Sequence, residues 1–168
     1  THSFDVERGP HIMDLVDLNK DKIPDMVVGS LGAQTLSVFL GNGKGSFEKA
    51  KVVKVGRFPH YRAYGDWNAD GHLDVAVAVA GEESIEVLLG NGRGDLEILV
   101  RYQAGVNPHG LISGTFKKKH LINTGHDGIT LAKGDFNEDG LIDLALVSAS
   151  SNSLNLYRGD GTGNFLLW

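Results

Sequence analysis

The sequence PHYRAYGDWNADGHLDVAVAVAGEESIEVLLGNGRGDL, residues 59–96, contains the features that decide the fold. A loop rich in Asp and Asn is followed by alternating residues at 74–79, a second alternating run at 85–89, and the segment GNGRG. Alternation with a period of two predicts β-strands, and segments rich in Gly and Asn between such runs predict tight turns. The stretch therefore predicts consecutive antiparallel strands.

The same pattern recurs along the chain. Pro59-His60 has counterparts in Pro10-His11, 49 residues earlier, and Pro108-His109, 49 residues later. The segment GNGRG, at 90–94, lies 49 residues after GNGKG at 41–45 and 69 residues before GDGTG at 159–163. The third copy therefore contains 20 extra residues, which fall around 95–125. We treat residues 1–168 as a single repeat domain with units 1–49, 50–98 and 99–168.

Each unit is predicted to contain about four strands. The strongest signals lie at 36–40, 61–65, 74–79, 85–89, 96–100 and 154–157, and no segment has a convincing helical period. An array of four-stranded units of about 50 residues is typical of a β-propeller. Propellers have about 4–8 blades, so three units predict an all-β, partial propeller-type array. One hypothesis is that a second copy of the chain closes the ring, and the other is that the chain is part of a larger propeller.

One stretch of each unit concentrates oxygen ligands in the pattern D-x-N-x-D-x-x-x-D. The three copies occupy residues 17–25, 66–74 and 135–143. Calcium binds six to eight oxygen atoms, and a short loop can supply them from side chains at positions 1, 3, 5 and 9 and from the carbonyl at position 7. Position 6 favours glycine, which is present as Gly71 and Gly140 but is replaced by Lys22 in the first copy. The pattern predicts calcium sites in the second and third loops, and a further site in the first loop that Lys22 would oppose.

Two other interpretations of these loops were considered. An EF-hand needs a glutamate at position 12, where the chain has Val28, Val77 and Leu146, and it needs flanking helices where strands are predicted. Asx turns that only cap backbone amides are the second alternative. Three carboxylates in every copy would repel one another without a cation, which favours a metal.

The combination of PHxxxxGDxNxDGxxD with a following VxLLGNGxG resembles the FG-GAP/VCBS repeat of integrin-α-type β-propellers. The resemblance covers the chain except for its 20 extra residues, and it implies calcium bound in the loop between the first two strands of each blade. The ligands that it implies are Asp17, Asn19, Asp21, Asp25 and the carbonyl of Ile23; Asp66, Asn68, Asp70, Asp74 and the carbonyl of His72; and Asp135, Asn137, Asp139, Asp143 and the carbonyl of Leu141.

Composition excludes several other classes of protein. The chain has no cysteine, which excludes disulfides and thiolate metal sites, and its apolar runs are far shorter than the ~20 residues of a membrane span. The basic run KKKH at 117–120 is too short for a nucleic-acid interface. No GxSxG, Walker or HExxH motif is present, so we expect neither an enzyme nor a catalytic site. His11, His60 and His109 share one repeat position, which favours a structural role.

Net charge supports the same interpretation. The chain has a formal charge of −5, with 21 acidic and 16 basic residues, and nine of the acids lie in the three loops. We therefore expect a slightly basic scaffold around three anionic metal sites. The resemblance implies a module for adhesion, or for binding a protein or carbohydrate ligand, in a secreted or cell-surface location. A purely structural scaffold is the alternative, and an enzyme is the third class.

Overall fold

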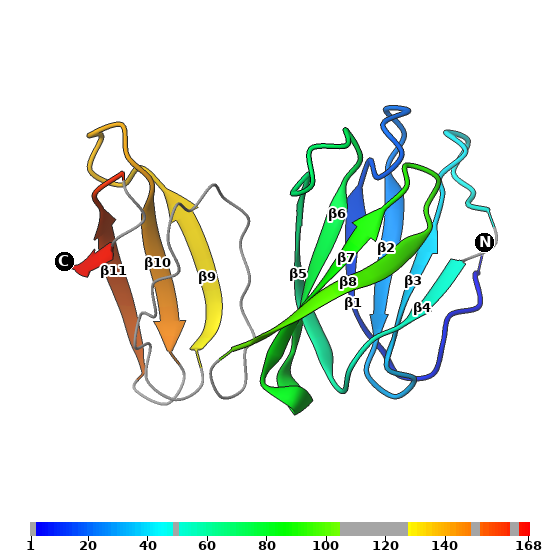
Figure 1. Ribbon diagram of the computed structural model, residues 1–168, viewed down its shortest axis with the longest axis horizontal. Coiled ribbons are helices and arrows are strands. Elements are labelled where there is room, and N and C mark those ends of the chain that lie inside the picture. The colour runs from blue at the N-terminus through cyan, green and yellow to red at the C-terminus, as the bar shows by residue number, and fades with distance from the viewer. Residues whose placement is uncertain (1–2, 49–50, 105–127, 149–151, 162–164) are drawn as a thin grey trace.

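The computed structural model describes residues 3–48, 51–104, 128–148, 152–161 and 165–168. The described strands form three antiparallel sheets of four (Figure 1). The first sheet contains β1 (Pro10–Val16), β2 (Asp25–Ser30), β3 (Thr35–Phe39) and β4 (Lys51–Lys54). The second contains β5 (Pro59–Gly65), β6 (Asp74–Val79), β7 (Ser84–Gly90) and β8 (Leu96–Gln103). The third contains β9 (Gly128–Gly134), β10 (Asp143–Ser148), β11 (Ser153–Gly159) and β12 (Phe165–Leu167).

Each sheet is a simple meander, in which every strand pairs with its neighbours in the chain. The prediction of an all-β array of four-stranded, propeller-type sheets is confirmed. The one helical segment among the described residues is a single 3-10 turn, Ala80–Glu82. Nothing in the described ranges forms a helix with the length and apolar character needed to cross a membrane.

The sheets reproduce the sequence repeat, with one correction. Strands β5, β6 and β7 start 49 residues after β1, β2 and β3, whereas β9, β10 and β11 start 69 residues after β5, β6 and β7. Gly128 therefore takes the position of Pro10 and Pro59 at the start of the first strand. Pro108-His109, which the sequence analysis gave the same repeat position, precedes this strand by 20 residues. Residues 105–127, which include this pair and the KKKH run, lie outside the described residues.

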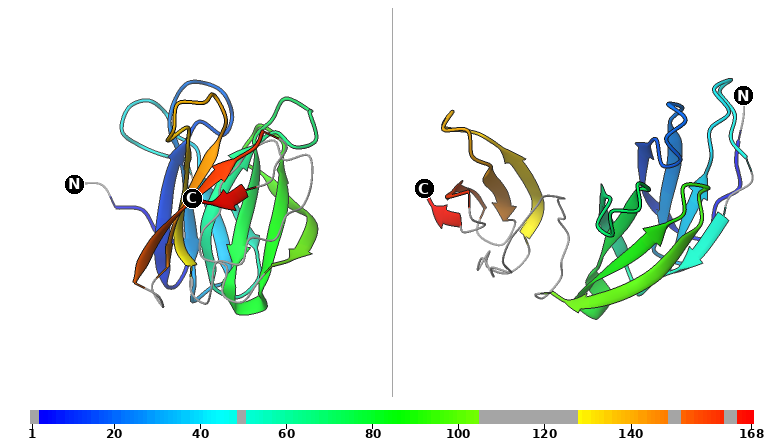
Figure 2. Two further views of the ribbon diagram at one scale, coloured as in Figure 1. Left: turned by 90° about the vertical axis from the view of Figure 1, so that its left-hand side faces the viewer. Right: turned by 45° about the horizontal axis from the view of Figure 1, so that its top comes forward.

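The first and second sheets pack face to face. Figures 1 and 2 show these two sheets side by side and the third sheet separate from the pair. Both sheets contribute to one hydrophobic core, because the alternating residues of β2, β3 and β6 place apolar side chains on the facing surfaces. The fully buried members of this core are Val27, Leu36, Val75, Val77, Val79 and Leu88.

The third sheet has a smaller cluster of its own. Its buried members are Leu144, Leu146 and Tyr157, and Leu131 and Phe165 pack against them. Leu144, Leu146, Tyr157 and Phe165 occupy the same repeat positions as core residues of the second sheet, whereas Leu131 stands where the second sheet has Arg62. The described residues thus form one two-sheet core and one separate single-sheet cluster.

Candidate metal-binding loops

The three Asp-rich loops connect the first and second strands of each sheet. In all three, the position 1 aspartate accepts a hydrogen bond from the backbone N–H of position 6, and the position 3 asparagine oxygen accepts one from the N–H of position 5. The first bond joins Lys22 to Asp17 at 2.8 Å, Gly71 to Asp66 at 2.9 Å and Gly140 to Asp135 at 2.8 Å. The second joins Asp21 to Asn19 at 3.0 Å, Asp70 to Asn68 at 3.1 Å and Asp139 to Asn137 at 3.0 Å. The side chains thus curl each loop around its own centre.

The position 5 aspartate continues this pattern. Its carboxylate accepts the N–H of position 7, at 2.8 Å from Ile23, 2.8 Å from His72 and 2.9 Å from Leu141. The N–H of His72 and the side-chain amide of Asn68 hold the pKa of Asp70 below its ordinary value. The Asp70 carboxylate is therefore ionised at neutral pH.

The first loop adopts the shape of the other two despite Lys22. Lys22 has φ 70°, close to the 87° of Gly71 and the 83° of Gly140. A residue with a Cβ is strained in this left-handed region, whereas glycine is not. The tertiary context therefore holds Lys22 in a conformation that its own sequence does not favour.

The position 9 aspartate has a role that the sequence analysis did not foresee. Asp25, Asp74 and Asp143 are fully buried. One oxygen of each accepts an N–H within its own loop, from Leu18 at 2.8 Å, Trp67 at 2.8 Å and Phe136 at 3.0 Å. The other oxygen accepts the N–H of the first hairpin glycine, from Gly41 at 2.9 Å, Gly90 at 3.1 Å and Gly159 at 2.9 Å. This aspartate joins the acidic loop to the glycine-rich hairpin of the same sheet.

Close backbone packing explains why the loop and the hairpin recur together. A Cβ on Gly90 would lie 2.0 Å from the carbonyl oxygen of Leu73, and one on Gly159 would lie 2.0 Å from that of Ile142. A side chain is sterically excluded at this position, so glycine is required where the two segments meet. The two sequence motifs are therefore halves of one structural unit.

The donor chemistry of the loops fits calcium. Each loop holds three carboxylates and one amide oxygen, the hard oxygen donors that calcium prefers. The Oδ1 atom of Asp17 is buried and has no hydrogen-bond partner, and a buried carboxylate oxygen without a partner is costly unless a cation or donor meets it. Within the described ranges, however, no three His, Cys, Asp or Glu side chains have the arrangement of a metal-binding cluster. The carboxylates are instead directed to their own backbone amides.

Comparison with known proteins finds one family model that matches part of the chain. Residues 17–77 match the model of the FG-GAP-like repeat. This segment, which contains the first two acidic loops, is similar to the FG-GAP-like repeat. The matched FG-GAP-like segment begins at the first acidic loop and ends in β6, so it includes the first hairpin and the whole second acidic loop. No curated protein matches the chain.

The contact between the first two sheets uses an ion pair with a buried arginine, which the sequence analysis did not single out. Nε of Arg62, on β5, donates to Oδ2 of Asp14, on β1, at 2.6 Å, and the hydroxyl of Tyr64 donates to the same oxygen at 2.8 Å. The Arg62 side chain is fully buried, and burial raises the pKa of Tyr64. The sequence did contain a signal for this pair. Arg62 is charged at a repeat position where the other two units have the apolar residues Met13 and Leu131.

Proposed function

We propose that the chain is a calcium-stabilised repeat module of propeller type that binds a protein or glycan partner without catalysing a reaction. The single observation that carries the calcium part is the threefold recurrence of one oxygen-rich loop with one hydrogen-bond pattern, in which Oδ1 of Asp17 is buried without a partner. FG-GAP-like repeats are typically non-enzymatic and typical of extracellular proteins. These properties of the family support a binding role outside the cell.

The residues that would hold calcium are those at positions 1, 3 and 5 of each loop, together with the carbonyl of position 7. Bound calcium supplies positive charge that offsets the repulsion among the three carboxylates. The position 9 aspartate transmits this stabilisation, because it already connects each loop to its hairpin. Calcium binding would therefore stabilise the pairing of the strands that these segments connect, and its free energy would add to that of folding.

Calorimetric calcium titration of loop variants tests this proposal. The variants Asp21→Asn, Asp70→Asn and Asp139→Asn each keep an oxygen that can accept the position 7 N–H and remove one negative charge. We expect three sites in the unmodified chain and the weakening or loss of one site in each variant. Asp95→Asn, outside the loops, is the matched control and should leave all three sites. Absence of calcium binding in the unmodified chain would overturn the proposal.

Binding of a partner requires a separate test. We expect glycan-array or protein-ligand binding in calcium that falls when a chelator is added, because the loops hold the hairpins in place. Calcium binding without any ligand would instead favour a purely structural scaffold. Extracellular calcium modules bind in the range of about 10⁻⁴–10⁻³ M, so the millimolar calcium outside cells would fill such sites.

Closure of the array by a second copy is part of the proposal. Met13 and Leu15 of β1 are 53% and 62% exposed, and they take the repeat positions at which Arg62 and Tyr64 contact the preceding sheet. Three sheets are fewer than the ~4–8 blades of a closed propeller, so this face is available to another sheet. Light scattering tests the point, since a dimer is expected and a strictly monomeric folded chain would contradict it.

A further inference from the structure

Two histidines from neighbouring sheets meet where the first strands of the two sheets approach each other. The ring of His11, at the start of β1, and the ring of His60, at the start of β5, have their centroids 5.5 Å apart and their planes at 89°. His11 is exposed and His60 is partly exposed. Solutes can therefore reach a contact between imidazoles of two different sheets.

The backbone has the same irregularity beside each histidine. The register of strand pairing shifts at the start of both β1 and β5, and a shift of this kind redirects a side chain out of the regular alternation. Two residues before each histidine the backbone is left-handed, with φ 71° at Gly9 and φ 55° at Phe58. An aromatic residue is strained in this region, and such strain is concentrated at functional sites. A strained turn thus begins the strand that carries His60.

Hydrogen bonds between the two sheets fix the strands that carry the pair. Arg62, two residues after His60, donates from Nε to Asp14 at 2.6 Å and from Nη1 to the carbonyl of His60 at 2.9 Å. Asp14 lies three residues after His11 on β1. One buried guanidinium therefore connects the backbone of His60 to the strand that carries His11.

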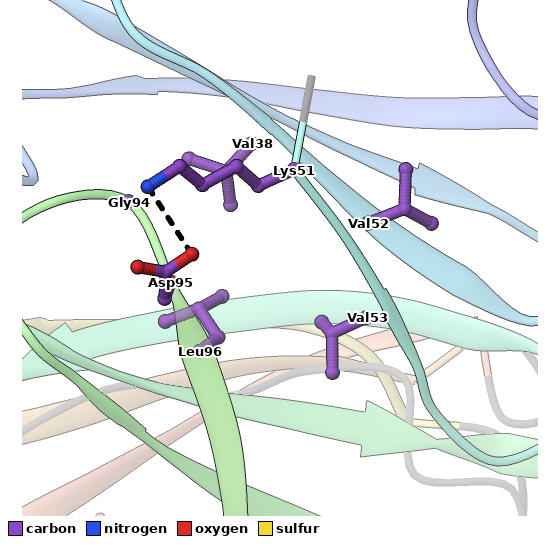
Figure 3. Close-up of a pocket in the computed structure, with 7 residues that line it drawn as sticks. All are labelled: Val38, Lys51, Val52, Val53, Gly94, Asp95 and Leu96. Atoms are coloured by element: carbon purple, nitrogen blue, oxygen red, sulfur yellow. Dashed lines mark ion pairs between the residues drawn. The ribbon is translucent and has the colours of Figure 1, made fainter. Parts of the chain in front are cut away.

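The contact beside the fourth strands of the same sheets has a different chemistry. There Lys51 of β4 forms an ion pair with Asp95 at 3.1 Å, beside a space of about 70 Å³ whose other lining residues are apolar or glycine (Figure 3). The ammonium of Lys51 already occupies the position that a cation would need beside Asp95. Imidazole nitrogens, in contrast, carry lone pairs that bind transition metals.

The separation of the two rings matches that of two imidazoles bound to one metal ion. With zinc–nitrogen distances of about 2.0–2.1 Å and a tetrahedral angle, the ring centroids of two ligands lie about 5 Å apart, close to the 5.5 Å between His11 and His60. Imidazole suits zinc, nickel and copper, whereas calcium prefers oxygen. Among the residues that the structure describes, no third His, Cys, Asp or Glu completes a cluster, so water would fill the other coordination positions.

We propose that His11 and His60 form a binding site for one divalent transition-metal ion of the zinc class. The site is separate from the oxygen-rich loops, does not depend on calcium and goes beyond the proposed function. The ion would bond to one strand of each sheet, so its binding free energy would add to the stability of the contact between them. The third sheet has Ile129 at the repeat position of His60, so the repeat itself does not require histidine there.

Calorimetric titration with zinc, in millimolar calcium so that the acidic loops are competed for, tests the site. We expect one zinc site in the unmodified chain that is lost or weakened in His11→Phe and in His60→Phe. Loss of an outer-shell partner alone lowers metal affinity about 10–100-fold, so loss of one ligand should lower it by at least about tenfold. Phenylalanine keeps an aromatic ring in the contact and removes the nitrogen ligands. Tyr61→Phe, at an exposed residue next to His60, is the matched control and should keep the site.

Thermal melts provide a second readout. Zinc should raise the melting temperature of the unmodified chain and of the Tyr61→Phe control, but not that of either histidine variant. Unchanged zinc binding in both histidine variants would overturn the proposal and reduce the contact to aromatic packing. If a variant fails to fold, NMR of the unmodified chain decides. Zinc should shift the assigned imidazole nitrogen signals of His11 and His60 together, and a shift of neither, or of one alone, would contradict the site.

Discussion

The junction between the first and second sheets and the separate third sheet use the same repeat positions with different chemistry. The first junction combines an apolar core with the buried pair of Arg62 and Asp14. The repeat positions equivalent to Arg62 and Asp14 hold Leu131 in the third sheet and Ala63 in the second. Apolar residues are therefore the feature that the sheets share, whereas the Arg62–Asp14 pair is particular to the contact between the first two sheets.

The largest expected effect comes from the apolar core between the first two sheets, whose positions are also apolar in the third sheet. Leu88 is fully buried in the two-sheet core, and its replacement leaves a cavity that the rigid sheets cannot close. We expect Leu88→Ala to lower the free energy of unfolding by about 2–5 kcal/mol, measured by urea denaturation. The exposed Leu166, 66% accessible, provides the control Leu166→Ala, with a much smaller effect. A similar loss in both variants would mean that the shared core is not the main source of stability.

The second prediction replaces the ion pair of the first junction by apolar residues. Asp14→Ala alone leaves the fully buried guanidinium of Arg62 without its anionic partner and should cost about 3 kcal/mol. The double variant Asp14→Ala with Arg62→Leu introduces the residues that stand at Ala63 and Leu131, and should be more stable than the single variant. A double-mutant cycle by urea denaturation measures the coupling. Strictly additive losses would show that the pair makes no specific contribution.

A smaller effect is expected in the first acidic loop. Lys22 has φ 70° where the other two loops have glycine. Lys22→Gly should therefore raise the free energy of unfolding by about 0.5–1 kcal/mol through relief of backbone strain, partly offset by the entropy of glycine in the unfolded chain. The reverse change, Gly71→Lys, should destabilise the protein. Thermal melts of both variants check the sign, and a destabilised Lys22→Gly would refute the strain argument.

The smallest effect concerns the surface ion pair between the first two sheets. The side-chain amide of Asn91 and the ammonium of Lys51 hold the pKa of Asp95 below its ordinary value. Because the pKa of Asp95 is lower in the folded than in the unfolded chain, its ionised carboxylate stabilises the fold. This stabilisation is complete above the unfolded pKa of about 3.9 and is lost as pH falls through the folded value. Asp95→Asn introduces the residue present at position 164. The difference in melting temperature from the unmodified chain should be present at pH 7 and shrink below pH 4.

The sequence predicted the sheets well because the determining signals are local and repeated. The alternating residues at 74–79 coincide with β6, Asp74–Val79, and each glycine-rich segment lies where the third strand of a sheet turns to the fourth. The predicted unit boundaries do not coincide with the ends of the sheets. Strand β4 lies beyond the first sequence boundary and β8 runs across the second, because a repeat has no intrinsic starting point.

The contacts between sheets were not predictable in the same way. The pair of Arg62 and Asp14 joins residues 48 positions apart, and only the packing of two complete sheets brings them together. The joint role of Asp25, Asp74 and Asp143 in loop and hairpin was missed for a similar reason. The pattern D-x-N-x-D-x-x-x-D groups this aspartate with the other candidate ligands, whereas the structure buries it against the glycine of a hairpin 16 residues further along.

The most direct test of the account is a thermal melt of the chain in calcium and in a chelator. If the three oxygen-rich loops bind calcium, each site adds about 2.7 kcal/mol of stability at a calcium concentration of 100 times its dissociation constant. The account predicts a melting temperature that rises steadily with calcium concentration and falls when the chelator is added. A melting temperature that is the same in calcium and in chelator would contradict it.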